Sequence, residues 1–400
     1  MKSFLFLFFL NLGSPCLWGQ VEIGGTVVDQ VTNSPIPFAS ILADDGQHGT
    51  VSNEKGEFTL SVAGMPVELL LSHISYKTSK FRIDSIQTGF VVVMEQAPVF
   101  LPEVSVDGNA AYKMVEKTFD RALAEKTVFH YGRAFYRQTS FMNQTPTEIL
   151  EGFFDTKFNN NGVEASKITE GRFAKREIKG SLNFLNFSIF AIGAGVYQER
   201  PKPILLPLSH EGLHAYDFEI LNILMEGDQE IVEISCQPHV GLRKPAFEGK
   251  IFVDRNREQI MKLSGIVRLG SQGFDLTRDR KPIPYHDAIL SLEVVFTNPS
   301  ADRYQLSHIK ADLQLLYNIG SEPYTAKITS LYTLFNYATA LNDVHFKKIR
   351  IKTNDLKTIQ SAPYNPEFWK DNPIVKRTPL EDDIVRSFES DGAFGNYIDH

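Results

Sequence analysis

Residues 21–62 read VEIGGTVVDQVTNSPIPFASILADDGQHGTVSNEKGEFTLSV, and this stretch decides the fold of the N-terminal part of the chain. Phe58, Leu60 and Val62 alternate with two hydroxyl residues, so one face of this segment is apolar and the other polar, as in a half-buried strand. Residues 53–56 separate it from the preceding run with an asparagine and a glycine, which are typical of turns between paired strands. The stretch therefore predicts a small antiparallel β-sandwich.

Six short motifs in this part of the chain carry a resemblance to a known family. They are Gly25-Thr-Val-Val-Asp29, Pro35-Ile-Pro-Phe-Ala-Ser40, Gly49-Thr50, Asn53-Glu-Lys-Gly56-Glu-Phe58, Ser72-His-Ile-Ser-Tyr76 and Leu101-Pro-Glu-Val104. Together they resemble the carboxypeptidase-regulatory-like domain, a transthyretin-like β-sandwich at the N-termini of many Gram-negative envelope proteins, including TonB-dependent receptors. The resemblance implies a sandwich fold and an envelope location, and it implies no peptidase activity. Relatives usually carry Asp where Asn53 stands, so we expect no metal-binding acid at that position.

The first 19 residues have the pattern of a secretory signal peptide. A lysine precedes a dense apolar run at residues 4–10, and Gly19 is a small residue at the cleavage site, so we expect the mature chain to begin at Gln20. A membrane anchor is one rival, but the run is much shorter than the roughly 20 residues that span a bilayer. Lipidation of Cys16 is another, although a proline stands directly before it. The sequence thus predicts an exported protein, either periplasmic or outer-membrane-associated.

The composition agrees with a folded, exported protein and argues against a nucleic-acid partner. The chain is 42% hydrophobic and 22% charged, with a formal net charge of -7 and no basic run, so it lacks the positive surface that binds phosphate groups. Once the signal peptide is removed, Cys236 is the only cysteine, which excludes an internal disulfide. It lies in the strand-like run of residues 231–236, where we expect a strand to bury the thiol.

Turn signals and composition divide the mature chain into four parts. These are a carboxypeptidase-regulatory-like sandwich at residues 20–97, a linker at 98–109, a large antiparallel β body at 110–360, and a C-terminal aromatic segment with a capped helix at 361–400. Within the sandwich, the continuous apolar runs at residues 67–71 and 90–94 predict central strands. The linker is predicted because two prolines and a glycine interrupt a stretch without any hydrophobic period.

The body is predicted to be one large, curved antiparallel sheet, resembling a half-barrel, preceded by a helix. Ala111, Val115, Ala122 and Leu123 recur at helical spacing. Short turns then join the strand-like runs, and short turns favour antiparallel neighbours because a parallel pair needs a crossover of about a dozen residues. The runs occupy residues 130–141, 147–158, 216–222, 230–236, 247–253, 259–268, 289–296, 304–317 and 324–337.

The C-terminal segment combines an aromatic stretch with a helix. Thr378 provides a cap, a proline follows it, and Glu381 stands at the position that reciprocates the cap. Gly392 is predicted to end this helix. Residues 364–369, YNPEFW, form an aromatic segment that we expect to be anchored on the large sheet, with docking to a partner protein as the alternative.

A stretch in the middle of the body, residues 207–253, carries a second resemblance. It resembles a segment of uncharacterised Gram-negative envelope proteins that pair the same N-terminal domain with a large C-terminal region. This resemblance supports the domain pairing and adds no chemistry.

One motif in this stretch has a catalytic signature. His210-Glu211-Gly212-Leu213-His214 fits the H-E-x-x-H pattern, in which a helix holds two zinc-binding histidines, here His210 and His214, and Glu211 would act as general base. The glycine inside the motif weakens such a helix by about 1 kcal/mol relative to alanine, and the strand period that follows keeps any helix short. A third ligand would have to come from a distant acid such as Glu230 or Glu233.

The sequence thus predicts a mainly β, exported envelope protein that acts by binding or as a scaffold, without catalysis and without a cofactor. Its partner is expected to be an envelope protein or an apolar ligand. One alternative is a carrier of a lipid or another apolar ligand, held on the large sheet by side chains such as Phe184, Phe187, Phe190 and Leu206. The other alternative is a zinc metallopeptidase that uses the H-E-x-x-H motif.

Overall fold

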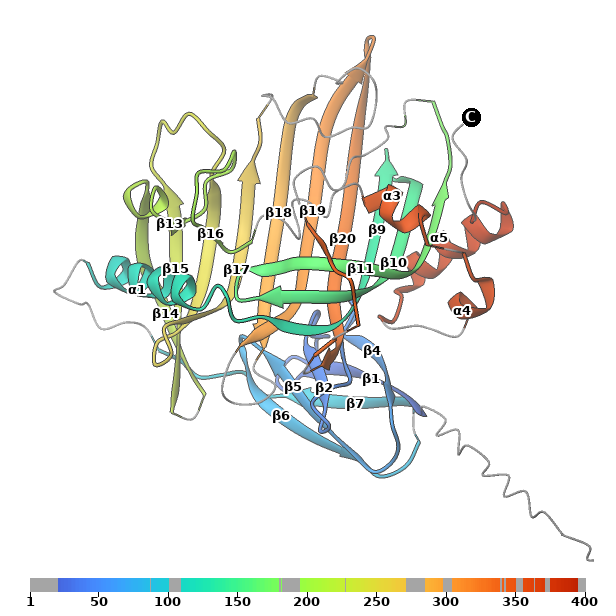
Figure 1. Cartoon of the computed structure of the whole chain (residues 1–400), viewed down its shortest axis with the longest axis horizontal. Coiled ribbons are helices and arrows are strands. Elements are labelled where there is room, and N and C mark those ends of the chain that lie inside the picture. The colour runs from blue at the N-terminus through green and yellow to red at the C-terminus, as the bar shows by residue number, and fades with distance from the viewer. Residues whose placement is uncertain are drawn as a thin grey trace, which may run out of the picture.

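The computed structural model shows a mainly β protein in which a small N-terminal sandwich precedes a large antiparallel sheet, as predicted (Figure 1). The residues that the structure describes are 21–86, 88–100, 109–179, 181, 195–226, 228–270, 285–297, 304–338, 340–341, 343–349, 355–362, 364–370 and 375–394. The predicted signal peptide and its cleavage site lie outside these ranges. Within them, no helix is both long enough and apolar enough to cross a membrane.

The N-terminal sandwich consists of two small sheets around an apolar core of its own. One sheet has the strand order β4-β1-β7 and the other β3-β2-β5-β6. Burial alternates along β4, where Phe58, Leu60 and Val62 point into the core, as predicted. The strands are β1 (Val21–Asp29), β2 (Ser40–Ala43), β3 (Gly49–Val51), β4 (Glu57–Val62), β5 (Val67–His73), β6 (Tyr76–Ile83) and β7 (Thr88–Met94).

Strand β7 departs from the prediction. The sequence predicts an antiparallel sandwich with a central strand at residues 90–94, but β7 pairs with β1 in parallel and lies at the edge of its sheet. Its side chains alternate, so that Phe90 and Val92 are buried while Val91 and Val93 are 53% and 49% exposed. A continuous apolar run therefore does not mean burial on both faces here, because every second valine faces solvent.

The body is an open sheet with twelve strands in the described part of the chain. Its order is β21-β11-β10-β9-β20-β19-β18-β17-β16-β15-β14-β8. One antiparallel meander runs from β9 to β11 and a second from β14 to β20, and the two join where β20 pairs with β9. The longer strands are β9 (His130–Met142), β10 (Thr145–Asn159), β11 (Gly162–Lys175), β14 (Tyr216–Glu226), β15 (Gln229–Pro238), β16 (Phe247–Asp254), β17 (Gln259–Arg268), β18 (Tyr285–Thr297), β19 (Gln305–Ile319) and β20 (Glu322–Ala338).

The sequence prediction missed strand β11. Charged residues interrupt its apolar alternation, and a register shift opposite Phe153 and Phe154 breaks the period of two. One of these charged residues, Arg172, is nevertheless buried. Its charge is balanced inside the protein, which local hydrophobicity cannot reveal. The shortest strands were also missed, namely β8 (Val99–Phe100), β12 (Tyr197–Gln198), β13 (Leu208–Ser209) and β21 (Lys347–Lys348).

Helix α1 (Ala110–Ala124) forms where the sequence predicts a helix, and it lies against one face of the large sheet. Val115 and Phe119 are fully buried in the main core together with Tyr136 of β9. We call this face of the sheet the α1 face. Cys236 of β15 lies in the same core and is fully buried, as predicted, and burial raises the pKa of its thiol.

The opposite face of β9 and β10 is covered by the C-terminal segment, and we call it the C-terminal face. Trp369 of α4 (Pro366–Lys370) packs against Phe153 with ring centroids 5.3 Å apart. Phe388 of α5 (Pro379–Ser390) is fully buried beside Ile149. The aromatic stretch at 364–369 is therefore anchored on the sheet, as predicted, and from Pro366 on it belongs to α4. A further helix, α3 (Asp355–Gln360), lies against β11.

Buried charges attach α5 to this face. Glu151 of β10 is 1% exposed and accepts hydrogen bonds from Arg137 (2.6 Å) and Arg172 (2.5 Å). Burial alone would raise the pKa of Glu151, but the guanidinium groups of Arg172 and Arg137 outweigh it and lower the pKa to about 2. Glu381 completes the predicted capping box with Thr378 and also accepts a hydrogen bond from Arg137 (3.1 Å). The cap of the helix is thus tied directly to the sheet.

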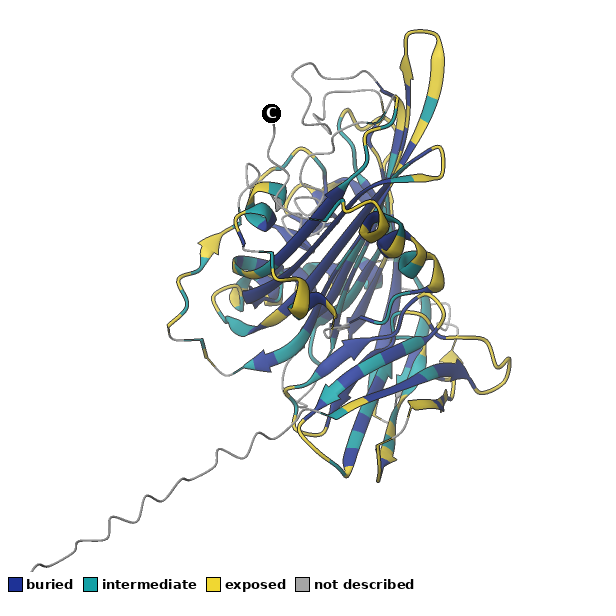
Figure 2. Ribbon diagram, turned by 90° about the vertical axis from the view of Figure 1, so that its right-hand side faces the viewer, coloured by how far each residue is buried: buried dark blue, intermediate teal, exposed yellow. Residues whose placement is uncertain are grey.

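The sandwich lies against one end of the large sheet, below the ends of β18 to β20 in Figure 1, and Figure 2 shows the same contact from the side. Leu42 of β2 belongs to the main core of the body, and Val51 of β3 packs with Phe135 and Trp369. A backbone hydrogen bond from Tyr337 to the carbonyl of Gln47 (2.9 Å) also crosses the contact. Side chains and backbone therefore both hold the two parts together.

The predicted linker begins as part of the sheet. Val99 and Phe100 form β8, which pairs with the edge strand β14. Residues 101–108 lie outside the described ranges, and the domain boundaries remain predictions.

Candidate functional site

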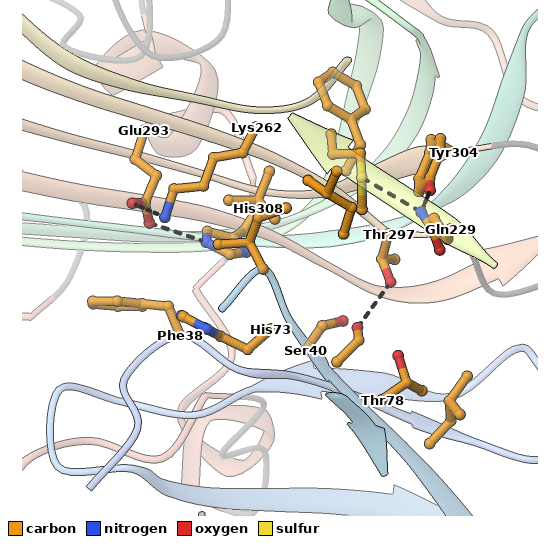
Figure 3. Close-up of a pocket in the computed structure, with 17 residues that line it drawn as sticks. Phe38, Ser40, His73, Thr78, Gln229, Lys262, Glu293, Thr297, Tyr304 and His308 are labelled. Atoms are coloured by element: carbon orange, nitrogen blue, oxygen red, sulfur yellow. Dashed lines mark hydrogen bonds and ion pairs between the residues drawn. The ribbon is translucent and has the colours of Figure 1, made fainter. Parts of the chain in front are cut away.

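A cavity lies where the sandwich meets the large sheet, and we call it the junction cavity (Figure 3). Strands β5 and β6 contribute one side of it, and β17, β18 and β19 contribute the other. Its volume is about 100 Å³. Apolar side chains such as Leu70, Ile231 and Met261 line it together with several hydroxyl groups. The cavity exists only because both parts of the chain enclose it.

Three polar side chains from neighbouring strands meet at one end of the cavity. Lys262 of β17 lies opposite Val295 of β18, and Val295 lies opposite His308 of β19, while Glu293 is two residues from Val295 and so shares its face. The Lys262 ammonium is 2.7 Å from the Glu293 carboxylate, and His308 Nε2 is 3.6 Å from it. This register makes a compact ion-pair group that Figure 3 shows facing the sandwich.

The charge of Glu293 is stabilised by this arrangement. Burial alone would raise its pKa, but the nearby His308 imidazole and the positive charge of Lys262 outweigh burial and hold the pKa well below its usual range. The carboxylate therefore stays ionised and paired. It is not placed to act as a proton acceptor near neutral pH.

His73 faces this group from the sandwich. Burial, and then the nearby positive charge of Lys262, lower the pKa of His73 from 6.5 to about 4. Its Nδ1 accepts a hydrogen bond from the backbone N–H of Ser75 (3.3 Å), and its ring packs edge-on against Tyr76 at 5.2 Å. Both the environment and the hydrogen bond favour the neutral imidazole.

The other end of the cavity is closed by a second hydrogen-bonded group. The Tyr304 hydroxyl donates to Asp254 (3.0 Å), and Gln229 donates to the same carboxylate (3.1 Å). Arg257 pairs with Asp254 at 2.7 Å, so the fully buried carboxylate has a charged partner. Burial, followed by the charge of Asp254, raises the pKa of Tyr304. This end is a satisfied structural network.

Hydrogen bonds between the sandwich and the large sheet lie at the edge of the junction cavity. The hydroxyls of Ser72 and Thr297 are 3.2 Å apart, and Ser307 donates to Ser40 at 3.5 Å. Farther along the same contact, Lys376 pairs with Glu57 at 3.1 Å. These contacts fix the position of the sandwich relative to the large sheet and the C-terminal segment.

The structure explains why this chain has Asn53 where relatives usually carry Asp. Its side-chain oxygen accepts hydrogen bonds from the backbone of Lys55 (2.8 Å) and Glu57 (3.0 Å), which forms the predicted turn. Its amide nitrogen donates to the Glu57 carboxylate (3.1 Å) and to the carbonyl of Lys376 in the C-terminal segment (3.3 Å). An aspartate cannot donate these bonds and would repel Glu57. The amide therefore suits a turn that also contacts the C-terminal segment.

The size and charge of the junction cavity limit what it can do chemically. Pockets that bind drug-sized ligands measure about 300–1,000 Å³, whereas this cavity has about 100 Å³. Lys262 and Glu293 are paired with each other, and His73 is neutral near pH 7. The arrangement is suited to holding the sandwich on the sheet.

The sequence did not reveal this group of residues. His73 and His308 are isolated histidines in the sequence, and Lys262 and Glu293 are ordinary strand residues. Only the register of three adjacent strands and the docking of the sandwich bring them together. No local signal carries that information.

The H-E-x-x-H motif lies on the surface, on a single short turn. The turn is a 3-10 helix of three residues, Gly212–His214, in keeping with the expectation that any helix here is short. Glu211 pairs with Lys244 at 2.5 Å, and the ring of His210 packs edge-on against Phe119 of α1 at 5.1 Å. Across the described ranges, no group of three or more His, Cys, Asp or Glu side chains is placed to hold a metal ion.

Close packing around Gly212 explains why a glycine stands at this position of the motif. A Cβ atom at this position would lie 2.3 Å from the carbonyl oxygen of Leu206 and 2.5 Å from that of Pro207. Its N–H donates to the hydroxyl of Ser209 (2.9 Å). The turn therefore packs too closely for any larger residue, and packing alone accounts for the glycine.

The lining predicted for an apolar carrier is only partly described. Phe184, Phe187 and Phe190 lie outside the described residues. Leu206 is fully buried in the main core, where its carbonyl accepts a hydrogen bond from Ser209 (2.8 Å). The one described member of this set is thus packed against the protein itself.

Comparison with known proteins gives a family match for the N-terminal part and distant structural likenesses over about 60% of the chain. The family model of the CarboxypepD_reg-like domain matches residues 23–106. No curated protein matches the sequence. Among solved structures, a DUF1329 family protein from Desulfovibrio piger is 9% identical with a TM-score of 0.22, over 60% of this chain and 96% of that chain. A LolA superfamily protein from Nitrosomonas europaea is 10% identical with a TM-score of 0.18, over 62% and 98%.

These structural likenesses are too weak to carry an argument about function, since every TM-score is far below 0.5. The match at the N-terminus stands on its own. It covers the motifs that carry the resemblance in the sequence and the two sheets of the sandwich. Residues 23–106 of this chain therefore match the CarboxypepD_reg-like domain.

Proposed function

We propose that this protein is an exported, non-enzymatic protein of the cell envelope, in which the sandwich is a docking module fixed on the large sheet. The observation that supports this most strongly is the junction cavity. Its ionic groups are paired inside the protein, and its volume of about 100 Å³ is small for a metabolite. Such a junction holds two parts in a fixed relation, which is what a binding scaffold requires.

The edge strand β7 supplies a surface for a partner. It ends its sheet in the order β4-β1-β7, and Val91 and Val93 are about half exposed on it. Ile86, just before the strand, is 67% exposed. Exposed edge strands with apolar side chains readily accept an added strand from another chain. An extended segment of an envelope protein is the partner that this edge fits.

A charge placed on this edge tests the proposal. We expect Val91→Lys with Val93→Lys to abolish co-purification of the full-length protein with a cross-linked envelope partner, because two ammonium groups would oppose docking of an apolar strand. Val31→Lys is the matched control, since Val31 is 82% exposed outside the β7 edge. If the double variant is still cross-linked to the partner, the β7 edge is not the docking surface.

The enzymatic alternative has its own test. Glu211→Gln should leave both the fold and any envelope phenotype unchanged, because Glu211 is paired with Lys244 on the surface. Stoichiometric zinc in the purified protein, together with a peptide-cleaving activity that is lost in Glu211→Gln, would replace the binding proposal with a metallopeptidase.

A further inference from the structure

A second and larger cavity lies at the same junction, on the side of the C-terminal segment. Its volume is about 340 Å³, which falls within the range of small-molecule sites. Strands β3 and β4 of the sandwich bound it on one side, and β9, β10, β11, β20 and α4 bound it on the other. We call it the aromatic cavity because Phe153, Phe335 and Phe368 line it.

The three rings form a corner. The rings of Phe153 and Phe335 have centroids 5.8 Å apart at an interplanar angle of 83°. Phe368 lies 5.0 Å from Phe153 at 87°. Rings set at right angles around a shared neighbour present both faces and edges to the space beside them, and the faces carry the negative part of the ring quadrupole. This is the geometry that attracts a cation.

A carboxylate oxygen without a hydrogen-bond partner lies beside these rings. Glu170 of β11 is directly opposite Phe153 of β10 in the sheet register, so the two side chains share a face. Its Oε2 atom is buried and has no hydrogen-bond partner anywhere in the described ranges. A buried carboxylate oxygen without a partner is costly, so the position favours a bound positive group.

The other charged groups at the aromatic cavity already have partners. Arg133 lies 3.5 Å from Asp155, and the imidazole of His48 is hydrogen-bonded to Asp45. A bound anion would have to compete with these carboxylates for Arg133 and His48. The charge that remains unmatched is therefore negative, and it belongs to Glu170.

We infer that the aromatic cavity binds a small organic ammonium ion, with the ammonium group between Glu170 and the three phenylalanine rings. A compact quaternary or primary ammonium carries a positive charge that would balance the Glu170 carboxylate. It also carries apolar surface that can pack against the rings. Both a free amine and the headgroup of a zwitterionic lipid have this chemistry. The inference goes beyond the proposed function and does not depend on it.

The chain provides its own reporter for a test. It has two tryptophans, Trp18 and Trp369, and Trp18 falls within the predicted signal peptide, so a chain beginning at Gln20 has Trp369 alone. Trp369 lies 5.3 Å from Phe153 and 5.5 Å from Phe368. Titration of this protein with choline chloride should therefore shift the tryptophan emission in a saturable way. The uncharged analogue 3,3-dimethylbutan-1-ol, which has the same shape, should bind at least about tenfold more weakly.

Single substitutions distinguish the contribution of the Glu170 charge to binding from that of the phenylalanine rings. Glu170→Gln keeps the shape of the side chain and should weaken choline binding by about tenfold or more, since it removes the unmatched charge. Phe335→Leu keeps an apolar side chain and should weaken binding by roughly threefold to thirtyfold, the range of one cation–π contact. Glu164→Gln is the matched control on the same strand, because Glu164 pairs with Lys348 at 2.7 Å and does not line the cavity. It should bind choline as the unmodified chain does.

Further arms of the experiment identify the source of the ammonium group. Co-sedimentation with phosphatidylcholine vesicles, but not with phosphatidylglycerol vesicles, would assign the site to a lipid headgroup. Binding of choline without sedimentation would assign it to free amines. The inference is overturned if the alcohol binds as well as choline, or if Glu170→Gln binds unchanged. It is also overturned if only inorganic phosphate binds, or if choline and ethanolamine fail to bind at about 10 mM, where even millimolar ligands are bound.

Discussion

The C-terminal segment and the N-terminal sandwich are both attached to the large sheet, but they are attached in different ways. The C-terminal segment covers a face of the sheet with buried aromatic rings and the buried pair of Glu151 with Arg137 and Arg172. The sandwich meets the end of the sheet with two buried apolar side chains, Leu42 and Val51, and with partly exposed ion pairs. Cavities remain at this second contact, among them the junction cavity and the aromatic cavity.

This difference indicates that the contact of the C-terminal segment is part of the core, whereas the contact of the sandwich resembles an interface between domains. The C-terminal contact is packed like the interior of a domain, so its removal should unfold the sheet around it. The contact of the sandwich is more polar and leaves enclosed space, as interfaces between domains do. Binding sites are commonly found at such interfaces, and the aromatic cavity lies there. The predictions below test this contrast, beginning with the largest expected effect.

Glu151→Ala should cause the largest loss of stability. It leaves the guanidinium groups of Arg137 and Arg172 buried without an anion, and breaking such a buried pair costs about 3–5 kcal/mol. Urea unfolding followed by circular dichroism measures the loss. Glu164→Ala, which removes a partly exposed pair with Lys348, should cost less than about 1 kcal/mol. Equal losses in the two variants would contradict the view that the C-terminal contact is core-like.

Leu42→Ala should cost somewhat less. Leu42 is the sandwich residue that enters the main core of the body, and truncation of a buried leucine costs about 2–5 kcal/mol. The same unfolding measurement checks it. Leu316→Ala is the control, because Leu316 is 47% exposed on β19 and should change stability by about 0.5 kcal/mol at most. A loss no larger than that of the control would mean that Leu42 does not join the two parts.

Acid should weaken the contact of the sandwich through His73. Its pKa is about 4 in the folded protein and about 6.5 in the unfolded chain, so between these values only the unfolded chain takes up the proton. The free energy of unfolding should therefore be unaffected by His73 above pH 6.5 and should fall as the pH drops from 6.5 towards 4. Glu293, whose pKa is lowered in the folded state, adds a further loss below its ordinary value of 4.5.

Replacement of the imidazole by a phenyl ring isolates the contribution of His73 to the pH dependence of stability. His73→Phe should flatten the slope of stability against pH between 6.5 and 4, as measured by urea unfolding at a series of pH values. It should leave the loss below pH 4.5 in place, because that loss belongs to carboxylates. An unchanged slope between 6.5 and 4 would show that His73 is not held neutral at the junction.

Lys376→Ala should have the smallest effect. Its pair with Glu57 spans 3.1 Å between partly exposed side chains, and pairs of this kind contribute roughly 0–1 kcal/mol. High salt should mask the difference between the variant and the unmodified protein. A loss comparable with that of Leu42→Ala would mean that ion pairs, and not apolar packing, hold the sandwich in place.

Local patterns in the sequence predicted the parts of this fold that depend on neighbouring residues. The alternation at Phe58, the capping box at Thr378 and the burial of Cys236 all appear in the structure, because each depends on residues a few positions apart. Strand β11 was missed because its buried Arg172 is balanced by Glu151 on another strand. The edge position of β7 depends on its parallel pairing with β1, which lies some 65 residues away in the chain.

Both cavities were beyond sequence prediction for the same reason. Lys262, Glu293 and His308 meet through the register of three strands, and Glu170 meets Phe153 through the pairing of β10 with β11. The sandwich then closes both spaces from outside the sheet. The conspicuous H-E-x-x-H motif, by contrast, lies on a surface turn where packing accounts for Gly212. Spacing in the sequence could not reveal either cavity, because the contacts that form them are all non-local.

Calorimetry of the full-length mature protein and of Leu42→Asp tests most directly whether the sandwich is fixed on the sheet. A charge at Leu42 would be buried without a partner in the main core, so it should separate the two parts. We expect one cooperative unfolding transition for the unmodified protein and two for Leu42→Asp, with the sandwich and the sheet unfolding at different temperatures. Two separate transitions in the unmodified protein, unaffected by Leu42→Asp, would contradict the account.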